Sequence, residues 1–275
     1  MKPKERLFVA LDDDGGPDFV PGKMEHPLVT QLQDEIGGFK IGSILFDMIG
    51  TLAGGDGVKT IGRPIMLDLK WHEPPDTMRR IADRMARNFD CEFCTIHARS
   101  GVETMRAFQD AAFKVAEGQA KQYQMPVSDW MTRILGVTVL TSETYDSLRK
   151  QGLVEMVFPA FEEFARREED REVEKLVLRL ALDAHTAGLD GVVCPSRFTT
   201  AVRKEFGPGF IIVNPGIRFA GSPADDHTNP MTPSQAIAAG ADYIVMGRPI
   251  TGAADPIAAA KRVVDEIAEA SVKRA

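Results

Sequence analysis

The sequence has few cysteines and no long apolar run. Its three cysteines, Cys91, Cys94 and Cys194, are too few for a disulfide framework in 275 residues, so we expect reduced thiols in the core. No apolar stretch approaches the roughly 20 residues of a transmembrane helix, which predicts no membrane partner. The run Leu7–Leu11 is too short for a signal peptide, which favours a cytoplasmic location.

The chain also lacks a dense basic stripe. It has 33 Lys and Arg residues against 40 Asp and Glu residues, a formal net charge of −7 and a sequence pI near 5.4. This acidic balance argues against general nucleic-acid binding. It leaves room for a local cationic pocket that binds a small anion.

Cys91, Cys94 and His97 have a spacing that superficially resembles a metal site. However, residues 92–97 have the pattern of a strand, on which positions 91 and 94 face opposite sides. We therefore expect no zinc site here.

Eight short apolar segments alternate with longer helical or polar stretches. Such alternation is typical of a parallel sheet covered on its outer face, and eight strands in about 250 residues suggest a closed barrel. We predict an α/β fold, a (β/α)8 TIM barrel, as a single domain over residues 1–275, because no linker, low-complexity tract or obvious repeat interrupts the pattern. The expected strands are Leu7–Leu11, Gly38–Ile41, Pro64–Leu69, Glu92–His97, Ile134–Leu140, Leu189–Cys194, Phe210–Val213 and Tyr243–Met246.

Two of the intervening helices can be placed from the spacing of apolar residues. Apolar residues at 173, 176, 177, 180, 181 and 184 predict one buried helical stripe, and the charged run 162–174 that leads into it is expected to be solvated. Near the end of the chain, Asp255 followed by Pro256 is typical of an N-cap and a first-turn proline. The helix that follows is expected to close the barrel.

An ion cluster ends the third predicted strand. Residues 65–73 read Ile-Met-Leu-Asp-Leu-Lys-Trp-His-Glu; alternation along the strand puts Asp68 and Lys70 on one face, with Glu73 past the strand end. Opposite charges so arranged can hold each other ionised, and chemistry is a common reason to tolerate their desolvation cost. On these residues alone, the alternative is a surface salt bridge at a loop.

In a barrel of this class, the reactive groups lie where strands end and the following loops begin. Polar groups or turn residues recur at the carboxyl ends of the predicted strands. Such a recurrence is hard to explain if these residues are only solvent-exposed and without function. In chain order they are Asp12, Lys40, Asp68, Lys70, His97, Thr141, Ser142, Pro195, Ser196, Pro215, Gly216, Gly247 and Arg248.

The loops after strands seven and eight predict a phosphate site. Asn214-Pro-Gly-Ile-Arg218 and Val245-Met-Gly-Arg248 offer glycines at which backbone N–H groups can approach an oxyanion, together with two guanidinium groups. A plain turn with two surface cations is the alternative. The polar stretch at about 218–230 predicts a lid over the phosphate, with an idle surface loop as its alternative.

Taken in order, these segments resemble one family, orotidine 5′-monophosphate decarboxylase. The resemblance covers nearly the whole chain and rests on the ordered set of motifs rather than on any one of them. The motifs are Val-Ala-Leu-Asp12, Phe-Lys40-Ile-Gly, Asp68-Leu-Lys70-Trp-His-Glu73-Pro-Pro-Asp-Thr77, Val-Thr-Val-Leu-Thr141-Ser, Gly-Val-Val-Cys194, Asn-Pro-Gly-Ile-Arg218 and Ala-Gly-Ala-Asp-Tyr-Ile-Val-Met-Gly247-Arg248.

The resemblance implies a carboxy-lyase without cofactor or metal, which takes orotidine 5′-monophosphate to uridine 5′-monophosphate and carbon dioxide in pyrimidine synthesis. It also implies a homodimer with sites at the interface. Lys70 would protonate the carbon that loses carbon dioxide, with Asp68 beside it and Lys40 orienting Asp68 and the sugar. The implied substrate-binding residues are Asp12 at the ribose, Thr141 at the pyrimidine and Gly247 and Arg248 at the phosphate, with Thr77, Pro195, Arg218 and His227.

Two positions depart from the family's pattern. The ion cluster usually ends in aspartate, where this chain has Glu73, and in the family that carboxylate reaches the neighbouring subunit's site. One extra methylene moves a carboxylate by about an ångström, and such a misplacement can cost ~100-fold in rate. The lid's usual phosphate-contacting glutamine falls at His227, which could donate to a phosphate or could be idle.

Three other interpretations remain open. A relative of the family performs metal-assisted chemistry on sugar phosphates with a similar Asp-x-Lys-x-x-Asp motif, but it has a glutamate where Lys40 stands, which disfavours a magnesium site. A catalytically weakened or silent nucleotide-binding protein could keep Asp12, Thr141 and Arg248 while tolerating Glu73. A structural barrel without a ligand leaves the charges at the strand ends unexplained.

Overall fold

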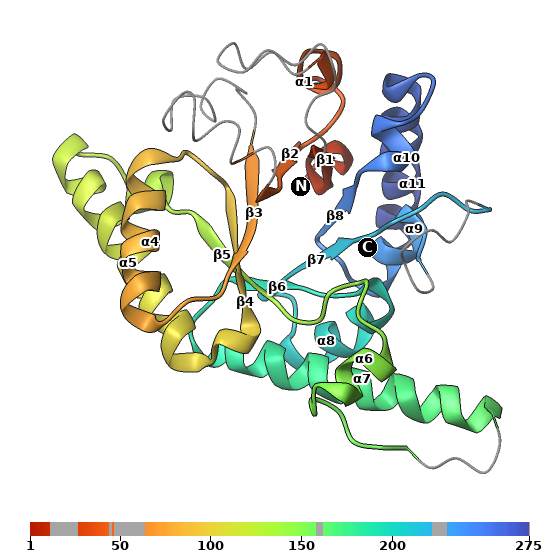
Figure 1. Cartoon of the computed structure of the whole chain (residues 1–275). Coiled ribbons are helices and arrows are strands. Elements are labelled where there is room, and N and C mark those ends of the chain that lie inside the picture. The colour runs from red at the N-terminus through yellow and green to blue at the C-terminus, as the bar shows by residue number, and fades with distance from the viewer. Residues whose placement is uncertain (12–26, 44–45, 47–63, 158–161, 222–229, 275) are drawn as a thin grey trace.

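The computed structural model describes residues 1–11, 27–43, 46, 64–157, 162–221 and 230–274. Within them, eight parallel strands pair in chain order, and β1 pairs with β8 to close a barrel (Figure 1). This confirms the predicted (β/α)8 class. The strands are β1 (Leu7–Leu11), β2 (Gly38–Ile41), β3 (Ile65–Trp71), β4 (Phe93–His97), β5 (Arg133–Val137), β6 (Gly191–Val193), β7 (Ile211–Pro215) and β8 (Tyr243–Met246).

Helices alternate with the strands and surround the barrel (Figure 1). The α-helices are α1 (Pro27–Leu32), α4 (Pro75–Asn88), α5 (Val102–Tyr123), α6 (Tyr145–Lys150), α7 (Glu162–Thr186), α8 (Thr199–Phe206), α9 (Pro233–Ala239), α10 (Arg248–Thr251) and α11 (Pro256–Arg274). Short 3-10 turns are η1 (Pro3–Arg6), η2 (Ala98–Ser100), η3 (Val127–Trp130) and η4 (Ser196–Phe198).

The two helices that could be placed from the sequence have the expected features. In α7, the apolar residues at positions 173, 176, 177, 180, 181 and 184 are all buried. Helix α11 begins where the carboxylate of Asp255 accepts a hydrogen bond of 2.9 Å from the backbone N–H of Ala258, and Pro256 is its first residue. The stripe of α7 is therefore buried as predicted, and α11 begins at the predicted N-cap.

Alternate residues of the strands face the inside of the barrel. On β4, Phe93 packs inside, whereas Cys94 and Ile96 belong to the outer core that the helices cover. Near the amino ends of the strands, the rings of Phe8, Phe93 and Tyr243 meet edge to face, with centroids 4.9 to 5.8 Å apart. These rings fill the bottom of the barrel, so space for a ligand is left at the carboxyl ends.

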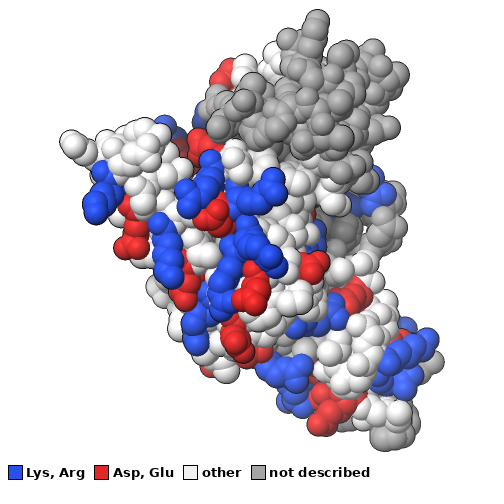
Figure 2. Space-filling model, turned by 60° about the vertical axis from the view of Figure 1, so that its left-hand side comes forward, with Lys and Arg blue, Asp and Glu red and all other residues white. Residues whose placement is uncertain are grey.

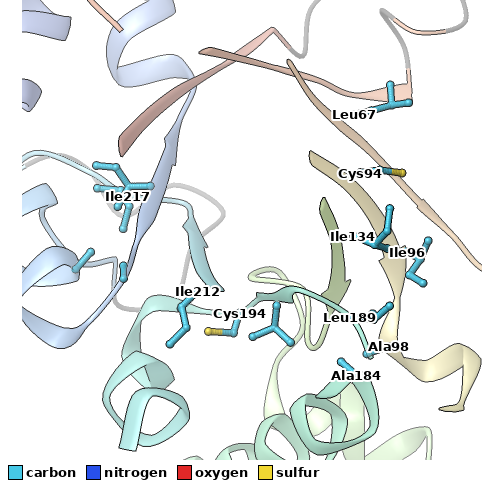
Figure 3. Packing of buried hydrophobic residues seen from close by; sticks show 14 of the residues in the cluster. Leu67, Cys94, Ile96, Ala98, Ile134, Ala184, Leu189, Cys194, Ile212 and Ile217 are labelled. Atoms are coloured by element: carbon cyan, nitrogen blue, oxygen red, sulfur yellow. The ribbon is translucent and has the colours of Figure 1, made fainter. Parts of the chain in front are cut away.

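The outer core packs closely between the strands and α7. Figure 3 shows Ile96 and Ala98 beside Ile134 of β5, with Ala184 of α7 facing them. Gly136 makes this approach possible, because a Cβ atom there would lie 3.0 Å from the Cβ of Ala184. The helix thereby holds β5 in place from outside.

The bounds of β1, β2 and β8 are as predicted, whereas those of β3 to β7 differ from the sequence prediction, most clearly at the carboxyl ends of β3 and β5. Strand β3 continues to Trp71, further than expected, with an irregular register against β4 just before that residue. Strand β5 ends at Val137 rather than Leu140, and a turn follows in which the N–H of Glu143 donates to the carbonyl of Leu140. Both irregularities lie at the carboxyl ends, where the site is expected.

The three cysteines lie in the core with free thiols. Burial raises the pKa of Cys91 and of Cys194 to about 12, so both are unreactive thiols at neutral pH. Among the described residues, no group of three or more His, Cys, Asp and Glu could hold a metal ion, and no helix is long and apolar enough to cross a membrane.

The outer face of α4 and α5 has interleaved positive and negative side chains (Figure 2). A groove of about 750 Å³ between these helices is lined by Arg84 and Arg106 together with Asp83 and Asp110. Because positively and negatively charged side chains alternate here, this face does not form the continuous basic stripe that a nucleic acid would need.

Candidate functional site

A cavity of about 650 Å³ opens at the carboxyl ends of the strands. Its floor is apolar and is formed by inward-facing strand residues, namely Ala10, Met66, Val137, Val193 and Val245. Charged and polar residues from the strand ends and the following loops form its walls. A volume of this size suits a small-molecule ligand.

Asp68 of β3 is the centre of an ion cluster on one wall. Its Oδ2 atom lies 2.7 Å from Nζ of Lys70 and 3.3 Å from Nζ of Lys40, and its side chain is only 10% exposed. Burial raises the pKa of Asp68, but the two ammonium groups and hydrogen bonds from Lys70 and Thr95 outweigh it, so the pKa lies below its usual value. The carboxylate is therefore ionised at neutral pH between two cations.

Lys70 is held in its place by an irregular backbone. Its φ angle of 49° is left-handed, a conformation that costs a residue with a side chain about 1–2 kcal/mol. Its N–H donates a 3.0 Å hydrogen bond to Oγ1 of Thr95, and Thr95 donates in turn to Oδ1 of Asp68 at 2.9 Å. The irregular end of β3 thus directs the Lys70 ammonium back to Asp68.

The sequence prediction missed Thr95, which is fully buried on β4. Alternation along β4 would have revealed it, because it places the polar Thr95 on the same inward face as Phe93. Lys40 lies at the same level on β2, where it faces Ala10 and Met66 in the register of the sheet. The predicted trio Lys40, Asp68 and Lys70 is therefore brought together.

The loops after β7 and β8 form the wall that the sequence predicts for phosphate. Gly216, Arg218, Gly247 and Arg248 all line the cavity. Gly216 has a φ angle of 76°, which favours glycine, and its turn brings the largely buried Arg218 to the cavity. The N–H of Arg218 donates to the carbonyl of Met231 at 3.1 Å, which joins the two ends of the predicted lid segment.

The turn after β5 contributes a third wall. Leu140, Thr141 and Ser142 line the cavity, between the cation cluster and the wall formed by β7 and β8. The side chains of Thr141 and Ser142 add hydroxyl groups to an otherwise apolar region of Val137 and Val139. This wall can therefore accept a flat, partly polar group.

Other predicted site residues lie elsewhere. Glu73 is exposed between β3 and α4, Thr77 is in the first turn of α4, and Pro195 is buried after β6; none of the three lines the cavity of its own chain. Asp12 and His227 fall outside the described residues, as does most of the predicted lid.

Comparison with known proteins decides the family. The sequence profile of the orotidine 5′-phosphate decarboxylase/HUMPS family matches residues 5–263. The chain belongs to this family.

Relatives within the decarboxylase/HUMPS family cover almost the whole chain. It is 38% identical over 267 residues to a protein of Moorella thermoacetica named orotidine 5′-phosphate decarboxylase, covering 97% of this chain and 94% of that protein. It is 36% identical over 264 residues to a protein of the same name from Trichlorobacter lovleyi, covering 96% and 95%. The solved orotidine 5′-phosphate decarboxylase of Lactobacillus acidophilus superposes with a TM-score of 0.68 at 29% identity, covering 95% of this chain and 98% of that one.

Proposed function

We propose that this protein is an orotidine 5′-phosphate decarboxylase, a carboxy-lyase that converts orotidine 5′-monophosphate to uridine 5′-monophosphate and carbon dioxide in de novo pyrimidine biosynthesis, without a cofactor. The observation that carries the proposal is the buried carboxylate of Asp68 held between Lys40 and Lys70 at the cavity wall. In a chain with this family membership, that arrangement supplies the charges that decarboxylation needs.

Binding would use the three walls of the cavity. The phosphate would lie against Gly247, Arg248 and Arg218, where backbone and guanidinium donors gather. The pyrimidine would lie along the turn of Thr141, and Lys40 would reach the sugar with Asp12. These contacts would place the substrate carboxylate beside Asp68. The binding energy of the phosphate and the sugar, which do not react, would hold the carboxylate there.

The chemical step follows from the charges. Asp68 repels the substrate carboxylate, and this repulsion is relieved as neutral carbon dioxide leaves and the C–C bonding pair stays on the ring carbon. The ammonium of Lys70, 2.7 Å from Asp68, stabilises that carbanion and then transfers a proton to it. Lys40 keeps Asp68 ionised while Lys70 loses its proton.

Lys40 also argues against the metal-dependent chemistry of the sugar-phosphate relatives. An ammonium in this position repels a divalent cation, whereas the glutamate of those relatives would bind one. A weakened or silent nucleotide-binding protein remains the second candidate, because Glu73 replaces the usual aspartate.

The proposal extends to features outside the described cavity. We propose that the protein is a cytoplasmic homodimer in which Glu73 and Thr77, at the start of α4, reach the neighbouring site. We also propose one domain with a phosphate lid at about 218–230, in which His227 donates to the phosphate. Glu73 is exposed, which is what contact with a second subunit requires.

The test is conversion of orotidine 5′-monophosphate by the purified protein in excess chelator. We expect turnover that chelator does not change, and a loss of kcat of roughly 100- to 10,000-fold in Lys70→Ala. Lys175→Ala is the matched control, because Lys175 also pairs with a carboxylate, Glu172, but is 70% exposed on α7. Turnover abolished by chelator would support the metal-using relative, and tight nucleotide binding without turnover would support the silent binder.

The variant Glu73→Asp tests the departure from the family pattern. We expect a higher kcat, by up to about 100-fold, because the shorter side chain restores the usual position of the carboxylate. Asp76→Glu, an exchange at an exposed carboxylate on α4, should leave kcat unchanged. A Glu73→Asp variant no faster than the natural protein would show that Glu73 is no handicap.

A further inference from the structure

The cavity wall that bears Thr141 and Ser142 is a tight turn closed at both ends by Glu143. The backbone N–H of Glu143 donates to the carbonyl of Leu140 at 3.0 Å, and the Oε2 atom of Glu143 accepts from the N–H of Leu140 at 3.0 Å. Thr141 and Ser142 are the two central residues of this turn. The direction of their hydroxyl groups therefore depends on the position of the Glu143 carboxylate.

Glu143 is itself held by Arg99. The Nη2 atom of Arg99 lies 2.7 and 2.9 Å from the two carboxylate oxygens of Glu143, and the side chains are 21% and 11% exposed. A carboxylate this buried requires a charged partner, because an unpaired one would be strongly destabilised. The ion pair therefore fixes the carboxylate that closes the turn.

Arg99 comes from a different part of the chain and is held at two further points. It lies in η2, directly after β4, where its backbone N–H donates to Nδ1 of His97 at 3.3 Å. Its Nη1 atom donates to Oε1 of Gln151 at 3.0 Å, at the far end of α6. The end of β4 thus fixes both the turn after β5 and the helix that follows it.

We infer that Arg99 and Glu143 are positioning residues that set the recognition of the pyrimidine base, an inference that rests on the proposed function. Neither residue lines the cavity, so both act through the turn. Within the described part of the chain, the hydroxyls of Thr141 and Ser142 have no hydrogen-bond partner, which leaves them available to a ligand. The pair holds these two hydroxyls at a fixed distance from the Asp68 cluster across the cavity.

This role predicts a split between base and phosphate recognition. The phosphate wall comes from β7 and β8, and β6 separates these strands from β5 in the barrel. Loosening the turn should weaken binding of a nucleoside monophosphate while leaving the affinity for inorganic phosphate unchanged. If the ion pair were purely structural, its loss would weaken the binding of both ligands or of neither.

The experiment compares Arg99→Met with the natural protein in the intact chain. We expect kcat/KM for orotidine 5′-monophosphate to fall about 10- to 100-fold, mainly through KM, with a similar loss of affinity for uridine 5′-monophosphate. The inhibition constant of inorganic phosphate should stay within about twofold, since its site is untouched. Arg87→Met is the matched control, because Arg87 also contacts both carboxylate oxygens of an acidic partner, Asp83, but on the exposed face of α4.

Two further variants keep the test decisive if Arg99→Met folds poorly. Arg99→Lys keeps the charge but not the fork, so it should recover part of the loss. The double variant Arg99→Met with Glu143→Gln should also recover part, because it removes the unpaired carboxylate and keeps an amide oxygen to accept from Leu140.

Equal losses of phosphate and nucleotide affinity, or lower thermal stability with unchanged KM, would overturn the inference. A natural protein that binds uridine 5′-monophosphate but never turns over orotidine 5′-monophosphate would instead defeat the proposed function. In that case the loss of nucleotide affinity in Arg99→Met would still measure the positioning role.

Discussion

The hydroxyl of Thr95 donates a 2.9 Å hydrogen bond to Asp68 and accepts a 3.0 Å hydrogen bond from the backbone N–H of Lys70. One buried side chain on β4 therefore fixes both the carboxylate of the ion cluster and the left-handed backbone that carries its cation. Because Thr95 satisfies one donor and one acceptor at once, a residue without a hydroxyl cannot replace it.

The variant Thr95→Val tests this relationship. Valine has the same shape but no hydroxyl, so Asp68 loses a hydrogen bond to its ionised form and the N–H of Lys70 loses its acceptor. We expect kcat to fall about 10-fold and the free energy of unfolding to fall by about 1–3 kcal/mol. Steady-state kinetics and urea unfolding measure the two effects.

Thr95→Ser is the matched control, because serine keeps the hydroxyl and loses only a methyl group. It should retain most of the activity. Equal activity of Thr95→Val and the natural protein would show that Lys40 and Lys70 alone hold Asp68.

The barrel can be predicted well from the sequence, because the patterns that indicate its strands and helices involve only residues close together in the chain. The period-two and continuous apolar patterns of the strands, and the stripe of α7, depend only on neighbouring residues. The same holds for Asp68 and Lys70, which are two residues apart. The features that the sequence prediction missed depend on contacts between residues far apart in the chain.

The contacts missed from sequence join distant residues. Thr95 is 27 residues from Asp68, and Arg99 is 44 residues from Glu143. The register shift near Trp71 depends on pairing with β4, so the longer end of β3 could not be read from β3 itself. Nothing in the local sequence reports which distant side chain will meet another.

Two glycine substitutions should have opposite effects on stability. At Gly191 of β6, an added Cβ would lie 2.2 Å from the backbone oxygen of Ile211 on β7, so the barrel would have to shift. We expect Gly191→Ala to lower the free energy of unfolding by about 1–3 kcal/mol. The measurement is the midpoint of urea unfolding.

Gly118 provides the matched comparison. It is an exposed residue of α5 with nothing within 4 Å of an added Cβ. Gly118→Ala should raise the free energy of unfolding by about 0.5–1 kcal/mol, because alanine favours the helix and restricts the unfolded chain. Stabilisation by both substitutions would contradict the close contact between β6 and β7.

The imidazole of His97 should make stability depend on pH. Burial, with Arg99 and His72 nearby, lowers the pKa of His97 to about 4, although Glu143 acts in the opposite direction. In the unfolded chain the pKa is about 6.5, so between these pH values the unfolded state binds a proton that the folded state does not. Folding stability should therefore decrease as the pH falls from about 6.5 to about 4, and be unaffected by this group above that range.

The natural protein and His97→Gln should be compared by urea unfolding from pH 7.5 to pH 4.5. His97 is partly exposed, so after allowance for solvent screening we expect its contribution to change by about 1–2 kcal/mol over this range. Glutamine cannot titrate, and Asp68 is common to both proteins. The difference between the two stabilities should therefore be constant above pH 6.5. Below that pH, the natural protein should lose stability relative to His97→Gln. Parallel curves over the whole range would mean that the imidazole titrates alike in the folded and unfolded chains, because only a difference in proton binding between those states can make stability depend on pH.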